Sequence, residues 1–316
     1  MISAPHSAAN PAALEPEIRA RLMRRATYAS VGVALVLVGA KLAAWIVTGS
    51  VALLASLIDS LLDALASVFN LLAVRHALTP ADREHRFGHG KAEALAGLGQ
   101  AALIAGSALF LIVESIDRLL RPQPLEETLP GIAVMVLSIA ATGTLVLYQR
   151  HVVTRTGSLA ISADRLHYFG DLLTNATVIV ALALASRQGL GWVDPVCALL
   201  VAGVILKSAY DIVRGALDHL MDRELADADR ERIKSCIRRH PQAQAMHDLR
   251  TRQSGNQTFI QFHLELDPEM PLREAHRISD EIEADLLALF PGAEVIIHQD
   301  PAGLAEDLPP FAGRAT

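Results

Sequence analysis

The apolar residues of this chain gather in six long runs, separated by short stretches rich in glycine, serine, proline and charge. A bilayer core about 30 Å thick is crossed by roughly 20 helical residues, and each run is about that long. Charged residues rarely interrupt the runs. The pattern therefore predicts six transmembrane helices, near residues 26–47, 51–75, 93–117, 131–149, 159–186 and 192–212.

The pattern changes after residue 212. Between Asp211 and Asp300 the chain carries 18 acidic and 11 basic residues in 90 positions, which requires water around it. Alternating apolar and polar residues predict two strands joined by the turn Ser254-Gly255-Asn256. A small α+β domain of order αββαβ, with its helices on one face of a sheet, is the expected fold. Its elements are predicted at 224–239, 246–253, 257–267, 272–289 and 294–299.

These two patterns divide the chain into a membrane part and a polar part. The first 15 residues are rich in Ala, Ser and Pro, and a short charged helix with four arginines is expected before the first span. We expect a disordered tail at 1–20, a six-helix transmembrane domain at 21–212, a polar domain at 213–303 and a C-terminal tail at 304–316.

The loops between the spans set the orientation, because Lys and Arg accumulate on the cytoplasmic side of a membrane. With an interior N-terminus, the inner loops hold 4, 4 and 2 basic residues and the outer loops hold 0, 2 and 1. The first run is too long for the apolar core of a signal peptide. We therefore expect a multi-pass membrane protein with both termini, and the polar domain, in the cytoplasm.

The amino-acid composition limits the classes of protein and the metal ligands that are possible. The chain is 52% hydrophobic with a mean hydropathy of +0.33, too apolar for an ordinary soluble protein. Cys197 and Cys236 lie in segments of opposite character, which argues against a disulfide or a cysteine-based zinc finger. The chain has no basic patch with interleaved aromatic residues, which argues against nucleic acid as a partner. Metal chemistry here would have to use histidine and carboxylates.

Two of the predicted spans carry polar pairs. Asp59 and Asp63 lie four apart in the second span, and His167 and Asp171 lie four apart in the fifth, so each pair occupies one helical face. An ionised side chain in mid-membrane costs roughly 2.5–3.5 kcal/mol unless it is paired, protonated or solvated. Three carboxylates and an imidazole can enclose a tetrahedral divalent ion such as Zn²⁺. The alternative is a purely structural hydrogen-bond network within the bundle.

Other polar residues of the spans have simpler interpretations. Lys41 lies near the end of its span, so its amine is expected to reach the membrane interface while its stem stays in lipid. Asn70 and Glu114 are expected to serve helix packing or helix ends, since neither belongs to a paired motif.

Asp82, His85 and His89 follow the second span in a polar loop. Histidines four apart with a nearby carboxylate suit a second, water-exposed metal site, although exposed histidines in basic loops are common without a metal. The loop lacks the His-Glu-x-x-His motif of a zinc protease.

The polar domain contains a third set of possible ligands. Strand periodicity puts His263 on the face opposite the apolar residues of its strand, and His298 and Asp300 are two apart and share a side. Metal binding and ordinary surface histidines both remain open for the set, which is His247, His263, His276, His298 and Asp300.

Three segments of the chain together resemble the cation diffusion facilitators, specifically the bacterial ferrous-iron and zinc efflux branch. They are Ser60-Leu-Leu-Asp63 with Asp59 before it, Phe87-Gly-His-Gly-Lys-Ala-Glu93, and Ala163-Asp-Arg-Leu-His-Tyr-Phe-Gly-Asp171. His247-Asp-Leu-Arg-Thr-Arg-Gln-Ser-Gly255 and Ile296-Ile-His-Gln-Asp-Pro301 are similar to that branch as well. The resemblance covers roughly residues 20 to 303; the N-terminal tail resembles nothing in the family.

The resemblance implies a homodimer in the bacterial cytoplasmic membrane that exports Zn²⁺, Cd²⁺ or Fe²⁺ in exchange for H⁺. It implies that Asp59, Asp63, His167 and Asp171 form the transport site and that Asp82, His85 and His89 form the loop site. The polar domain resembles a metallochaperone-like domain with a regulatory binuclear site at His247, His263, His276, His298 and Asp300. Lys91 and Asp222 resemble a charge pair that links the membrane and cytoplasmic parts.

The ligand set also bears on mechanism. Three carboxylates around one small cavity cannot all stay ionised without a metal, because burial and like-charge repulsion both oppose it. Metal entry must therefore displace protons, which predicts a secondary transporter and not an enzyme. Two rival classes are an intramembrane aspartyl protease, which has no use for a second aspartate four residues from Asp59, and a non-transporting metal sensor, which needs no buried ligands in the bilayer.

Overall fold

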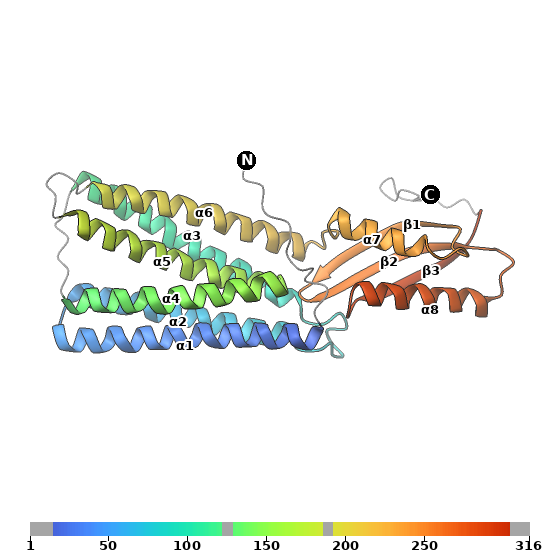
Figure 1. Cartoon of the computed structure of the whole chain (residues 1–316), viewed down its shortest axis with the longest axis horizontal. Coiled ribbons are helices and arrows are strands. Elements are labelled where there is room, and N and C mark those ends of the chain that lie inside the picture. Colours follow the sequence, from blue (N-terminus) through green and yellow to red (C-terminus); the bar gives the residue numbers. More distant parts are fainter. Residues whose placement is uncertain (1–14, 122–128, 186–191, 304–316) are drawn as a thin grey trace. The chain divides into compact units, whose positions relative to one another are not determined.

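The structure is a computed structural model that describes residues 15–121, 129–185 and 192–303, and it consists of two compact units. One unit, residues 20–217, is a bundle of long helices that run side by side (Figure 1). The other comprises, within the described residues, 218–303 together with 15–19. The predicted tail segments 1–14 and 304–316 lie outside the described residues.

Six helices form the bundle, at the positions that hydropathy predicts. They are α1 (Pro16–Thr48), α2 (Val51–Ala77), α3 (Lys91–Leu120), α4 (Leu129–Thr156), α5 (Leu159–Ala185) and α6 (Val193–Leu220). Within the described residues, five of them are long and apolar enough to cross a membrane. The sixth is α5, which has 27 residues. The prediction of a separate charged helix before the first span is wrong, because the four arginines belong to α1, which continues without a break into the span.

Small residues bring the helices of the bundle close together. Ala101, Ala108 and Ala163 are buried between α3, α5 and α6. Gly170 on α5 is the tightest point: a Cβ added there would lie 3.0 Å from Cδ1 of Ile205 on α6. The polar pair His167 and Asp171 is therefore carried by a helix that packs closely against its neighbours.

The second unit has the predicted order αββαβ. Its elements are α7 (Asp227–Ile237), β1 (Ala245–Ser254), β2 (Gln257–Leu266), α8 (Leu272–Leu289) and β3 (Glu294–Pro301). The sheet order is β1-β2-β3, with β2 antiparallel to β1 and parallel to β3. Side chains of α7 and α8 share one apolar core with the inward residues of the strands, Ile260, Phe262, Leu264 and Leu266 among them.

The register of the sheet aligns three histidines. His247 on β1 is opposite His263 on β2, and His263 is opposite His298 on β3. An irregularity in β1 follows immediately, where Asp248 has a φ of 49° and the pairing resumes at Arg250. Three imidazoles thus cross the sheet in one row, on the face away from the helices.

Candidate metal sites

In the bundle, α2 and α5 bring three of the four predicted transport residues together. Nε2 of His167 lies 2.9 Å from Oδ1 of Asp63 and 3.8 Å from Oδ2 of Asp171. One ligand atom from each residue lies within 4.8 Å of the others. His167 and Asp171 are one turn apart on α5 and share a face. The group therefore forms wherever α2 packs against that face with Asp63 turned toward it.

This group has the chemistry of a divalent-cation site. Two carboxylates and an imidazole are oxygen and nitrogen ligands, and typical zinc distances to them are about 2.0–2.2 Å. The hydrogen bond between His167 and Asp63 occupies the place where such an ion would bind, so the same atoms can hold either a proton or a metal. Asp59, the fourth predicted residue, lies one turn from Asp63 on α2; its side chain is exposed and is not part of the converging group.

Lys41 does not extend to the membrane interface, and that interpretation was wrong. Its Nζ donates to Oγ of Ser60 at 2.6 Å and to the backbone carbonyl of Ser56 at 3.2 Å, both on α2. Ser60 lies next to Asp59 and three residues before Asp63. The ammonium group therefore faces the acidic side of α2, because the contact between α1 and α2 offers it acceptors.

A buried hydrogen-bond network that the sequence analysis missed lies beside this group. Oδ2 of Asp164 accepts from Oγ of Ser30 at 2.6 Å and from Nε2 of Gln149 at 2.7 Å, which ties α5 to α1 and α4. The Tyr168 hydroxyl contacts Oγ of Ser67 on α2 at 2.7 Å. Asp164 and Tyr168 flank His167, so the network holds α5 in place near the metal ligands. The signal in the sequence was an ionisable residue within an apolar run.

The remaining polar residues of the spans are not part of these groups. Asn70 is fully buried on α2, and its amide has no hydrogen-bond partner within the described residues. Glu114 accepts from Nε of Arg118 at 2.9 Å on the exposed surface of α3. Both results agree with packing and surface roles.

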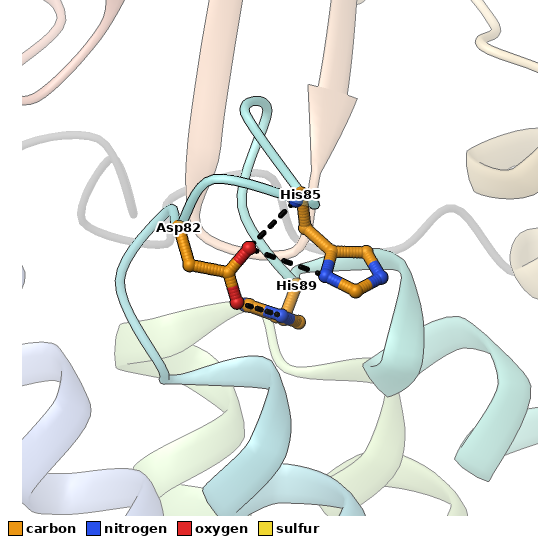
Figure 2. Close-up of side chains that lie close together, drawn as sticks. All are labelled: Asp82, His85 and His89. Carbon is orange, nitrogen blue, oxygen red and sulfur yellow. Dashed lines mark hydrogen bonds and ion pairs between the residues drawn. The ribbon is translucent and has the colours of Figure 1, made fainter.

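The loop between α2 and α3 brings Asp82, His85 and His89 together (Figure 2). Oδ1 of Asp82 accepts from the backbone N–H groups of Glu84 at 2.9 Å and His85 at 2.7 Å, which folds the loop around the carboxylate. Nδ1 of His85 lies 3.4 Å from Oδ1 and Nε2 of His89 lies 3.3 Å from Oδ2. The backbone hydrogen bond from His85 lowers the pKa of Asp82, so this carboxylate stays ionised and able to bind a cation.

In the second unit, Asp300 is the centre of the histidine row. Its Oδ2 lies 2.7 Å from Nδ1 of His263 and 3.5 Å from Nε2 of His247, and its Oδ1 lies 3.1 Å from Nε2 of His298. The carboxylate is buried, whereas His298 is exposed. His276 is on α8, exposed, with Nδ1 3.6 Å from Asp280, and is not among the residues whose ligand atoms converge.

The predicted interdomain pair involves one residue from each unit. Asp222 has a left-handed backbone with a φ of 55°, and its Oδ1 lies 3.3 Å from Nη1 of Arg252 in the same unit. Lys91 begins α3 in the other unit. Their pairing stays a prediction.

The chain is similar to cation efflux proteins over most of its length. Residues 27–221 match the family "Cation efflux transmembrane domain", and residues 225–302 match "Cation efflux protein, cytoplasmic domain". The cation-efflux pump FieF of Shewanella oneidensis is 47% identical, over 88% of this chain and 94% of that relative. FieF of Pectobacterium carotovorum is 50% identical, over 89% of this chain and 94% of the relative. The solved structure of CzrB in its Zn form is 37% identical over 27% of this chain and 98% of that chain, with a TM-score of 0.25.

Proposed function

This chain belongs to the cation diffusion facilitator family of cation efflux proteins, and on that premise we propose that it exports a divalent metal cation from the cytoplasm in exchange for protons. The observation that carries the proposal is the convergence of Asp63 from α2 with His167 and Asp171 from α5. These are ionisable groups from two separate membrane helices, where an unpaired charge is costly.

The exchange follows from competition for the same atoms. With a metal bound, the two carboxylates are ionised and the imidazole offers a lone pair. Without it, the carboxylates repel one another in a region of low dielectric, so protons must take the place of the metal. Loading from the cytoplasm releases protons, and protonation from the outer side releases the metal. Asp59 is proposed as the fourth ligand, one turn away on α2.

The ligand types limit the cargo. Oxygen and nitrogen ligands without thiolate suit Zn²⁺, Cd²⁺ and Fe²⁺ and disfavour Cu(I). Both termini are proposed to lie in the cytoplasm of a bacterium, with the bundle in its inner membrane. The proposed domain limits are those of the sequence: 21–212 for the transmembrane domain and 213–303 for the metal-binding domain.

We propose that the groups outside the membrane regulate transport. The loop group of Asp82, His85 and His89 lies at the cytoplasmic end of α2. The Asp300 group, with His247, His263 and His298, lies in the cytoplasmic domain, and His276 is proposed to join it in a homodimer. The ligand types support this role: the Asp300 carboxylate and the imidazoles around it are groups that suit a divalent cation, and Glu265, 3.3 Å from Nδ1 of His247, is a further carboxylate beside them.

The transport site is tested by Asp63→Ala and Asp171→Ala, each assayed for zinc export from cells and for expression and folding. We expect folded protein and loss of export, because each variant removes a metal ligand. Asp211→Ala is the matched control, since its carboxylate pairs with Lys207 on the exposed surface of α6. Export at the control's rate by either site variant would overturn the assignment.

A further inference from the structure

A fourth histidine lies beside the loop group. His76 is in the last turn of α2, and its ring centroid is 4.6 Å from that of His89, with the planes at 61°. The rings of His85 and His89 are 4.5 Å apart, so three imidazoles and the Asp82 carboxylate occupy one small region. His76 is not part of the loop site that the sequence predicts.

The three loop residues leave a coordination position open. Zinc takes four ligands in protein sites, and sites with only three protein ligands keep water at the fourth position. Nδ1 of His89 lies 3.4 Å from the backbone carbonyl of Thr79, while its Nε2 faces Asp82 (Figure 2). This contact with the Thr79 carbonyl orients the ring for metal binding through Nε2.

His76 is at the turn that joins α2 to the loop. The N–H of Thr79 donates to the carbonyl of His76 at 2.9 Å, so the chain turns at the end of α2 and returns toward the same ring. The His76 side chain is exposed, and its ring nitrogens have no hydrogen-bond partner within the described residues. Its nitrogens are not among the ligand atoms that converge at Asp82, so binding would need a change in the His76 side-chain rotamer.

We propose that His76 is the fourth ligand of the loop site, which makes it a closed site of three histidines and one aspartate. The inference rests on the proposed loop site and extends it. A metal held this way fastens the loop at 78–90 to the end of α2. A closed tetrahedral site also favours Zn²⁺ over ions that prefer six ligands, such as Fe²⁺ and Mn²⁺.

A histidine at the C-terminal end of a helix has another ordinary use, because its positive form interacts favourably with the helix dipole. That role involves no metal. The two interpretations therefore differ in what happens to zinc binding when His76 is replaced.

The experiment uses the purified full-length protein with Asp171→Ala, His263→Ala and Asp300→Ala, which disable the other two groups. Zinc titration gives the affinity of the loop site, and zinc-edge X-ray absorption counts the bound imidazoles. We expect three imidazoles in this parent and two after His76→Phe, with affinity lower by about tenfold or more, since even outer-shell changes cost 10- to 100-fold. His76→Asp, which supplies a carboxylate ligand, should recover most of the affinity.

The matched control is His151→Phe, an exposed histidine on α4, which should bind zinc as the parent does. Equal affinity and an equal imidazole count in the His76→Phe variant would overturn the role of His76 while leaving the three-residue site intact. A parent that binds no zinc would overturn the loop site itself, and with it this inference.

Discussion

Several buried polar side chains of the bundle hydrogen-bond to groups on other helices, unlike the amide of Asn70, which has no such partner within the described residues. Asp164 shows this most clearly: Ser30 and Gln149 donate to one oxygen of its buried carboxylate from two other helices. Ser30 also contacts the carbonyl of Ala26 at 3.1 Å. Since a donor or acceptor buried without a partner costs about 1–3 kcal/mol, the network stabilises a particular arrangement of α1, α4 and α5.

Replacing Asp164 should therefore destabilise the bundle. Asp164→Ala removes the acceptor that links α5 to α1 and α4, leaving the Ser30 hydroxyl only the Ala26 carbonyl and the Gln149 amide only Oγ of Ser30, and we expect a loss of roughly 1–3 kcal/mol. Asp164→Asn keeps an acceptor oxygen and should retain most of the stability. Thermal unfolding in detergent measures both variants; equal midpoints would show that the network contributes nothing.

The position of a polar side chain was predictable where the residue spacing within its own helix determines it. Four-residue spacing pointed to Asp63, His167 and Asp171, which the structure brings together, whereas Asp59 is outside that group and its role as a ligand stays a prediction. Lys41 was misinterpreted because the acceptors of its amine lie on a different helix, and the pattern of one helix does not show which neighbour it meets.

At the scale of elements, hydropathy predicted the helices well because lipid sets both their length and their composition. Helix α5 was predicted too, although it carries His167, Asp171 and the buried Asp164. In the cytoplasmic unit, strand alternation predicted the buried face of β2 from Ile260 to Leu266. Phe259 is on the opposite face of β2 and is buried as well, with Cζ of Arg252 4.2 Å from its ring centroid.

The contact between α5 and α6 at Gly170 should be sensitive to volume. Gly170→Ala places a methyl group 3.0 Å from Cδ1 of Ile205, next to Asp171, so we expect slower zinc export. Adding Ile205→Ala should restore the rate by making room. Gly203→Ala on α6 is the control, because an added Cβ there has no atom within 4 Å. An export rate that Gly170→Ala does not change would contradict this packing argument.

At the scale of the whole molecule, the sequence predicted two units, one surrounded by lipid and the other by water. It could not determine the assembly, because the proposed partner is a second copy and its contacts leave no periodic pattern in one chain. The apolar residues exposed on the bundle, such as Phe110 and Val47, are consistent with contact to lipid or to a second copy.

The regulatory proposal makes a prediction about this assembly. Zinc at the Asp300 group neutralises charge and cross-links three strands, so we expect the two cytoplasmic domains of a dimer to move closer or become more ordered. Distances between spin labels on α8 of the two copies, measured with zinc and with a chelator, test this. Identical distance distributions would remove the sensing role, and His263→Ala should abolish any change.

The central claim is that one set of atoms exchanges a metal for protons. It is tested most directly with the purified protein in liposomes, by following internal pH while Zn²⁺, Cd²⁺, Fe²⁺ or Mn²⁺ is supplied on one side. We predict metal uptake accompanied by proton movement in the opposite direction for Zn²⁺, Cd²⁺ or Fe²⁺, and neither flux with Asp171→Ala. Metal uptake without proton movement, or both fluxes unchanged in Asp171→Ala, would contradict the account.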